Sequence, residues 1–239
     1  MSKVCVCSDY FIMNDDGELC LQPGTMGPRQ LLTFANPGTF QFSKATYPWL
    51  ARVRVEVQGG GGGSAGADAA ATQCIPRPGG AGGGYSMSLL DVSALGAVET
   101  VVVGVGGAGG TGNNPGDAGD PSSFGGFVSA PGGPGGSVTI ASGVVTTAAT
   151  GISTPNTGNG QIVTSGGTSG GAVRLSGTAG LAGAGGDAHF GYGGYPRASE
   201  GAGSPARGHG AGAGGALSYG NPFAGAKGGN GIVVVELYG

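Results

Sequence analysis

Residues 51–63 read Ala-Arg-Val-Arg-Val-Glu-Val-Gln-Gly-Gly-Gly-Gly-Gly. The first eight positions alternate polar side chains with valine, which is typical of a strand that buries one face. The glycine block that follows belongs to a wider pattern, because 59 of the 239 residues are glycine, several times the usual share. Ordering a glycine costs more backbone entropy than ordering any other residue. We therefore expect a fold in which backbones pack too closely for a Cβ atom.

The composition argues against two other common states of glycine-rich chains, intrinsic disorder and the collagen triple helix. Disordered chains combine low hydrophobicity with high charge, whereas this chain is 38% hydrophobic and only 10% charged. Collagen needs glycine at every third position, and Gly112-Asn-Asn-Pro-Gly116 breaks that period. The sequence predicts an ordered, compact protein.

Further β-strand patterns flank the glycine blocks, and none shows the 3.6-residue period of a helix. Asn36-Pro-Gly38 has the residues of a hairpin turn between two of these patterns. We expect strands at 31–34, 39–42, 51–58, 85–92, 99–103, 124–129 and 231–238.

Between Gly132 and Asn230 the chain is mostly glycine, alanine, serine and threonine. Such runs can form extended helices with three residues per turn, bundled through lateral backbone hydrogen bonds with glycine at the contacts. The terminal strands 51–58 and 231–238 are expected to pair and close the scaffold around this bundle. The predicted fold class is all-β: an antiparallel, sandwich-like scaffold with long polyglycine-II-like segments and almost no helix.

The first 29 residues differ from the rest and suggest a small module of short strands and turns, followed by a glycine-rich β domain over 30–239. This module holds Cys5, Cys7 and Cys20, whereas Cys74 is far away. Cys5 and Cys7 are too close for the usual zinc-ligand spacing. Free or buried thiols are favoured, with a late disulfide such as Cys5–Cys20 and a metal site as the alternatives.

Charge and hydropathy limit the functional classes. The 10 basic and 13 acidic residues are scattered, so no basic stripe indicates a nucleic-acid partner. No apolar run reaches transmembrane length, and the N-terminus lacks the apolar region of a secretory signal. We expect assembly in a cytoplasm, or export by a route without a standard signal.

Three motifs resemble cofactor, catalytic or metal sites without the required context. Gly104-Val-Gly-Gly-Ala-Gly109 follows a strand, but the next residues cannot form the helix that a dinucleotide site needs. Gly167-Thr-Ser-Gly-Gly171 matches a nucleophile elbow without a following helix. Gly183-Ala-Gly-Gly-Asp-Ala-His189 resembles a single calcium repeat and is better explained as a solvated loop. We predict no enzymatic activity, no cofactor and no metal.

Aromatic residues among the glycines are the best candidates for binding. Phe190, Tyr192 and Tyr195 lie within His189-Phe-Gly-Tyr-Gly-Gly-Tyr-Pro196, and Tyr219 and Phe223 follow as weaker candidates. Aromatic rings stack on sugar faces and other apolar surfaces at low entropic cost. The alternative is that these rings cap the bundle or pack between subunits. By contrast, Trp49 is expected to anchor the β core.

Several segments, in this order, resemble the glycine-rich domain of bacteriophage tail proteins. They are Pro37-Gly-Thr-Phe-Gln-Phe42, Val53–Val57 with Gly59–Gly63, Gly82-Gly-Gly-Tyr85, Val101–Gly110, Ser122-Ser-Phe-Gly125 and Gly231-Ile-Val-Val-Val-Glu236. Asp16-Gly-Glu-Leu-Cys-Leu-Gln-Pro-Gly24 is similar to the leader of minor tail proteins from phages of actinobacteria. Some tail-fibre adhesins that stack polyglycine helices beneath receptor-binding loops provide an analogue.

The resemblance implies a structural virion protein, a minor tail, fibre or tip component that contributes to host attachment. Its implied partners are other tail proteins, a host-envelope glycan or lipid contacted by the aromatic candidates, and further copies of itself, with a trimer favoured. The implied location is the virion, after assembly in the host cytoplasm. The alternatives are a capsid or neck decoration without receptor contact and a cell-wall-associated glycine-rich protein.

Overall fold

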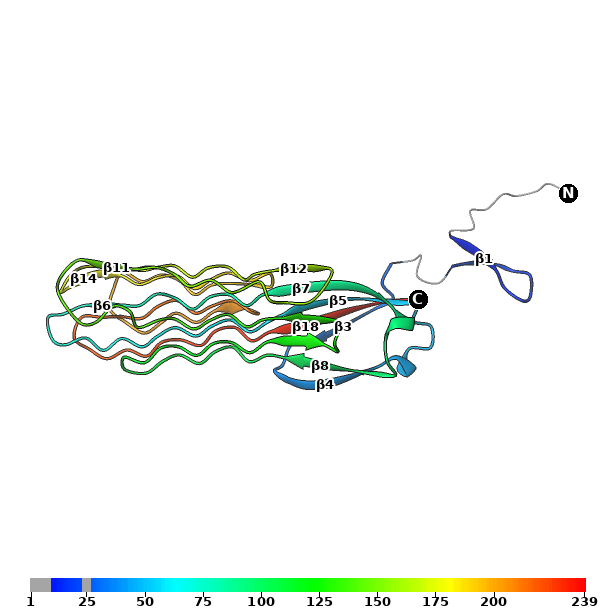
Figure 1. Ribbon diagram of the computed structural model, residues 1–239, viewed down its shortest axis with the longest axis horizontal. Coiled ribbons are helices and arrows are strands. Elements are labelled where there is room, and N and C mark those ends of the chain that lie inside the picture. The colour runs from blue at the N-terminus through cyan, green and yellow to red at the C-terminus, as the bar shows by residue number, and fades with distance from the viewer. Residues whose placement is uncertain (1–9, 23–26) are drawn as a thin grey trace.

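The computed structural model describes residues 10–22 and 27–239. From residue 27 onward the chain forms a long body, with a β-sandwich at one end and wavy extended segments running to the other (Figure 1). Helix is confined to two single 3-10 turns, η1 (Lys44–Thr46) and η2 (Val92–Ala94), in the described part of the chain. The all-β prediction is confirmed. None of the described helices is long and apolar enough to cross a membrane.

Two antiparallel sheets form the sandwich. The larger has the order β12-β7-β5-β18-β3, and the smaller has the order β10-β9-β8-β4. In the larger sheet the strands are β12 (Ile162–Thr164), β7 (Tyr85–Asp91), β5 (Arg52–Gln58), β18 (Ile232–Tyr238) and β3 (Gln30–Phe34). In the smaller sheet they are β10 (Val128–Ala130), β9 (Ser122–Phe124), β8 (Val98–Val103) and β4 (Gly38–Ser43).

Alternation along β5 and β18 builds the sandwich core. Val53, Val55 and Val57 of β5 are fully buried, and they face the core beside Val233 and Val235 of β18. Each buried valine contributes roughly 1.5–3 kcal/mol relative to an exposed one. The predicted pairing of the two terminal strands is confirmed, and Trp49 packs against this core as expected.

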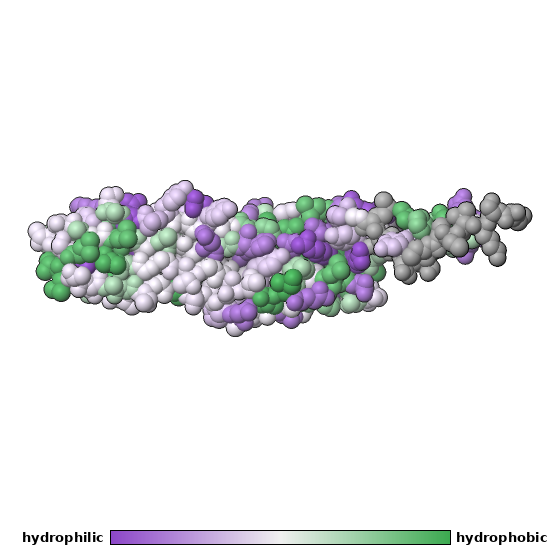
Figure 2. Space-filling model, turned by 90° about the horizontal axis from the view of Figure 1, so that it is seen from above, coloured by the Kyte–Doolittle hydropathy of each residue, from purple (hydrophilic) through white to green (hydrophobic). Residues whose placement is uncertain are grey.

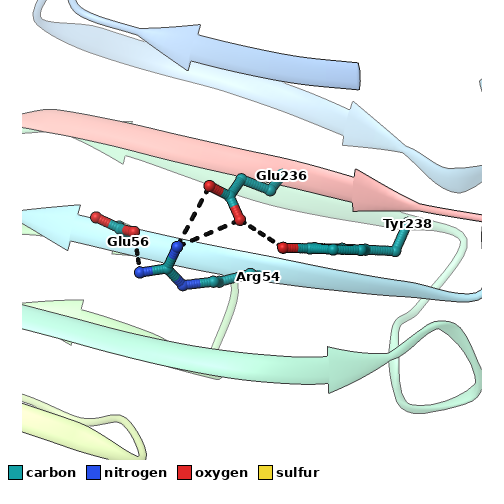
Figure 3. A network of polar contacts seen from close by, with 4 residues as sticks. All are labelled: Arg54, Glu56, Glu236 and Tyr238. Carbon is teal, nitrogen blue, oxygen red and sulfur yellow. Dashed lines mark hydrogen bonds and ion pairs between the residues drawn. The ribbon is translucent and has the colours of Figure 1, made fainter. Parts of the chain in front are cut away.

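The outer face of the larger sheet carries a network of polar contacts (Figure 3). Arg54 forms ion pairs with Glu56 on its own strand and with Glu236 on β18. Tyr238 donates a hydrogen bond of 2.7 Å to Glu236. These contacts place one cation between two carboxylates and link β5 to β18 on this face of the sheet.

Beyond the sandwich the strands continue directly into the bundle. Segment 59–67 extends β5, and segment 77–84 returns from the far end into β7. Further segments leave or enter the other sandwich strands or connect short strands within the bundle: 104–110, 115–121, 131–136, 151–158, 165–171, 182–187, 193–197, 202–206, 210–216 and 224–231.

Hydrogen bonds along segment 59–67 repeat every three residues. The amides of Gly60, Gly63 and Gly66 all donate to segment 115–121 or to Asn114 beside it, and the intervening amides donate to two other neighbours. Its carbonyls accept from three more segments, 104–110, 131–136 and 210–216. The segment is thus a three-residue-per-turn helix surrounded by six others. Segment 77–84 is bonded to six neighbours as well.

Glycine content follows the number of neighbours that a segment contacts. On the fully enclosed segment 59–67, a Cβ built on any of its six glycines would overlap the backbone of another segment. Segment 104–110 lies at the surface and exposes Val105 and Ala108 between pairs of inward glycines. Segment 115–121 keeps only Gly116 and Gly119 inside. Surface positions therefore accept larger side chains, whereas enclosed positions hold glycine or a small residue such as Ala65.

Four expectations need correction. The bundle is built around segments 59–67 and 77–84, which come well before Gly132. These two segments are enclosed by others, and enclosed segments need the highest density of glycine. The terminal strands sit at one end of the bundle and do not surround it (Figure 1). The turn at 36–38 connects two different sheets, since β3 and β4 pair with β18 and β8. The strand expected at 124–129 is a hairpin, because glycines 125 and 126 turn the chain between β9 and β10.

Short strands also occur within residues 1–29, where strands and turns were expected, and within the bundle, where none was expected. An N-terminal hairpin is formed by β1 (Phe11–Met13) and β2 (Leu19–Leu21), outside the body (Figure 1). In the bundle the strands are β6 (Ile75–Pro76), β11 (Thr147–Ala149), β13 (Ala172–Ser176), β14 (Ala179–Leu181), β15 (Gly191–Tyr192), β16 (Arg207–Gly208) and β17 (Leu217–Ser218).

A methyl group inside the bundle should be far more disruptive than one at a turn. We predict that Gly62→Ala lowers the free energy of unfolding by about 3 kcal/mol or more, because its Cβ would overlap the carbonyl oxygen of Pro134. Gly126→Ala is the control, since a Cβ at Gly126 meets nothing within 4 Å. Urea denaturation measures both variants, and equal stabilities would contradict the enclosed-segment account.

Candidate functional site

The far end of the bundle, the distal tip, is capped by the three-stranded sheet β11-β13-β14. Alternation along β13 decides which side chains face outward: Arg174 is buried, and Leu175 is 59% exposed. Leu181 on β14 pairs with Val173 on that outer face. Few residues in this part of the sequence have large side chains, and those few project from the surface.

Apolar side chains gather at this end (Figure 2). Leu175, Leu181, Val144 and Val145 form what we call the apolar cap, with exposures between 45% and 71%. Two hydrogen bonds hold the cap together: Thr146 donates to the Leu175 carbonyl, and Arg174 donates to the Val145 carbonyl. Exposed contiguous apolar surface on a soluble domain commonly marks an interaction site.

Two buried arginines hold the loops beneath the cap. Arg77 is 1% exposed and donates to the Gly66 carbonyl, the Ile140 carbonyl and the side-chain oxygen of Asn113, at 2.7–2.9 Å. Arg174 donates to the carbonyls of Val145, Ala141 and Cys74. Each guanidinium therefore joins segments that are remote in sequence, as its fixed fork of donors allows.

Burial changes the titration of groups at the tip. Burial lowers the pKa of Arg77 to about 10, so the guanidinium still carries its charge at neutral pH. Burial also raises the pKa of the Cys74 thiol, against the opposing effect of Arg174. The Cys74 thiol is therefore protonated and enclosed, which disfavours reaction.

Two of the predicted binding residues lie at the tip, where they pack inward. Phe223 packs against Ala67, Ala69, Ile75 and Ala216, and Tyr219 against Cys74, Ala182 and Leu217. The Tyr219 hydroxyl donates to the Ala198 carbonyl at 3.1 Å. Glu200 accepts the Tyr219 amide, which lowers the pKa of that carboxyl.

The other three predicted residues lie nearer the sandwich. Phe190 meets the ring of Tyr85 edge-on, while His189 stacks on the same ring at 4.1 Å. Burial, with Glu56 nearby, raises the pKa of Tyr85 to about 12. Tyr192 and Tyr195 are exposed on the side of the bundle, at 68% and 59%. The five candidates thus occupy three separate places.

The cap residues were missed by sequence reasoning. The stretch between Gly132 and Asn230 reads as small residues, and exposure cannot be deduced from the pattern alone. The adjacent Val144-Val145 and the Val-Arg-Leu run at 173–175 are the signals that stand out there.

The other motifs and residues that were considered as catalytic, cofactor or metal sites have places in the fold that can be described. Ser169 of the elbow-like motif is buried, and its hydroxyl accepts the Ile152 amide at 3.0 Å. Segment 104–110, which carries the dinucleotide-like pattern, is a bundle segment. Among residues 10–22 and 27–239, no three metal-ligating side chains cluster. Cys20 and Cys74 are free thiols, whereas Cys5 and Cys7 lie outside the described residues.

The comparisons with known proteins identify one family. A family model described as a glycine-rich domain matches residues 35–238. No curated protein matches the chain. The match spans nearly all of the sandwich and the whole bundle.

Removing the Arg77 guanidinium should loosen the tip from inside. We predict that Arg77→Gln lowers the free energy of unfolding by about 3 kcal/mol or more, because two buried carbonyls and the side-chain oxygen of Asn113 lose their donor. Lys227→Gln, at an exposed lysine on the bundle side, is the matched charge control. Thermal denaturation compares the two variants. A loss of unfolding free energy below 0.5 kcal/mol for Arg77→Gln would contradict the role of Arg77 in holding these loops together.

Proposed function

Since the chain belongs to the glycine-rich domain family, we propose that it is a structural protein of a bacteriophage tail, a minor tail or fibre-tip component that contributes to attachment to the host surface. The observation that carries the proposal is the apolar cap on the distal tip. The ordered resemblance to phage tail segments supports the same assignment.

The placement of the ends supports a display role. The N-terminal hairpin and the C-terminal residue both lie at the sandwich end, opposite the apolar cap (Figure 1). A connection to other proteins at the sandwich end leaves the cap as the free end. The bundle between them is held by backbone hydrogen bonds along its length, so it acts as a rigid spacer.

The cap has the chemistry of a weak, general contact. Its four aliphatic side chains carry no charge and rest on loops that the two arginines hold in place. A patch of this size binds weakly by itself, but several copies on one particle add their contacts through effective concentration. This mechanism suits an apolar component of an envelope surface.

Polar substitutions in the cap should weaken attachment. We predict that Val145→Ser with Leu175→Ser lowers binding of the purified protein to intact actinobacterial cells by tenfold or more, because the apolar contact is lost. Leu31→Ser with Val98→Ser is the control, since these residues are similarly exposed but lie on the sandwich. Unchanged binding of the cap variant would favour a decoration protein without receptor contact.

The N-terminal hairpin has features of an attachment module. A two-stranded hairpin is at best marginally stable in water, and this one exposes apolar side chains: Ile12, Met13, Leu19 and Leu21. Met13 and Leu19 are directly paired on one face of the hairpin. A tail protein that covers these residues would complete the module.

Deleting residues 1–29 should therefore release the domain from particles while leaving it folded. We expect the truncated protein to retain the circular dichroism spectrum of the parent but to be absent from purified virions, as measured by immunogold labelling. Normal incorporation of the truncated protein would contradict this role for the module.

A further inference from the structure

Tyr192 and Tyr195 flank Arg207 on the side of the bundle. The Arg207 guanidinium carbon lies 4.0 Å from the ring centre of Tyr195 and 5.7 Å from that of Tyr192. Among the described aromatic residues, only these two tyrosines and Tyr10 are strongly exposed. Among the described residues outside the N-terminal hairpin, the two strongly exposed aromatic rings thus lie beside the same arginine.

The backbone fixes these three residues on one face. Tyr192 and Arg207 are directly paired across β15 and β16. Tyr195 follows Tyr192 by three residues, one turn of the extended helix, or about 9 Å along its axis. The guanidinium lies over one face of each ring, and the two rings with the cation between them span about the length of two sugar rings.

Bundle contacts hold this surface rigid. The amide of Gly194 donates to Gly212, and the Gly194 carbonyl accepts from Gly185. A Cβ on Gly193 would overlap the carbonyl of Gly185. The chain between the two tyrosines is thus packed directly against neighbouring backbones, and a ligand pays little ordering entropy.

Arg207 retains donors for a ligand. Its Nε donates to the Gly193 carbonyl at 3.1 Å, and Nη1 donates to the Tyr195 hydroxyl at 2.7 Å. Of the five guanidinium N–H groups, three are left for other acceptors. Within the described residues Arg207 has no ion-pair partner. The nearby carboxylate of Asp187 accepts the Gly193 amide at 2.7 Å.

We propose that Tyr192, Tyr195 and Arg207 bind an acidic saccharide, a pyranose chain that carries a carboxylate or a phosphate. The tyrosine faces turned away from Arg207 stack on the C–H faces of the sugar rings, and the free Arg207 donors take the anionic group, for which the guanidinium fork is suited. The site deepens the proposed function and rests on it for a biological role, because it names the glycan class at the host surface.

Both features of the ligand are needed. A free phosphate ion offers no ring face to the tyrosines, and a neutral sugar offers no anion to Arg207. An anionic lipid headgroup shares the charge but has no extended row of pyranose rings. These differences define the arms of the test.

The test measures binding of the full chain to defined saccharides by titration calorimetry. The probes are an oligosaccharide of glucuronic acid and N-acetylglucosamine, its carboxyl-reduced form, a phosphate-bearing oligosaccharide, inorganic phosphate and vesicles with anionic headgroups. We expect at least one acidic saccharide to bind tenfold or more tightly than the reduced form, and than phosphate or vesicles. Absence of binding to both acidic saccharides overturns the proposal, as does equal binding of the reduced form.

Variants assign the binding to the three residues. We expect Arg207→Gln and the double variant Tyr192→Ala with Tyr195→Ala each to weaken binding tenfold or more, with Arg207→Lys intermediate. Lys227→Gln and Tyr10→Ala are the controls, because Lys227 lines a different groove with Asp117 and Asp120, and Tyr10 lies in the N-terminal hairpin. Full binding by Arg207→Gln with an unchanged melting temperature overturns the role of the guanidinium.

The assay separates this site from the proposed function, because it uses neither cells nor virions. Saccharide binding by a protein that is absent from virions would overturn the tail assignment and leave the site in place. Loss of cell binding in the cap variant, with no saccharide binding by the parent, would support the attachment role and remove the site.

Discussion

Lateral hydrogen bonding between backbones is the constraint from which the rest of the structure follows. In segment 59–67 the amides from Gly59 to Ser64 donate in turn to three other segments, and three further segments donate to its carbonyls and complete the ring. Backbones that exchange such bonds on all sides leave little space for side chains, so the enclosed positions are glycine or, as at Ser64 and Ala65, a small residue. The sandwich strands set the register of the segments that extend directly from them, such as 59–67 and 77–84.

Local pattern predicted the sandwich strands and the nature of the bundle, but not its arrangement. The alternation from Val53 to Val57 reports burial directly, and the glycine runs indicate close backbone contact. A three-residue period does not say which segments are neighbours, so the enclosed position of 59–67 was not predictable. The same holds for Val145 and for Arg207, whose settings depend on segments that are remote in sequence.

Large side chains in the bundle concentrate where backbone bonding stops. At the distal tip the segments turn, and aliphatic residues and two buried arginines replace glycine as the means of holding the chain. On the flank, an aromatic and cationic surface stands on a segment whose other faces are packed. The bundle thus separates a chemically apolar end from a chemically polar side on one rigid support.

The order in which the six neighbours of segment 59–67 occur along the chain has a consequence for folding. Its bonded partners extend from Ala81 to Gly229, so the last wall of the enclosure comes from residues close to the C-terminal strand. Folding that depends on contacts so distant in sequence is slow, since loop-closure entropy must be overcome before those contacts form. The bundle cannot be completed before residues 224–238 have been synthesised, and it should order in one late, cooperative step after strand β18 has joined the sheet.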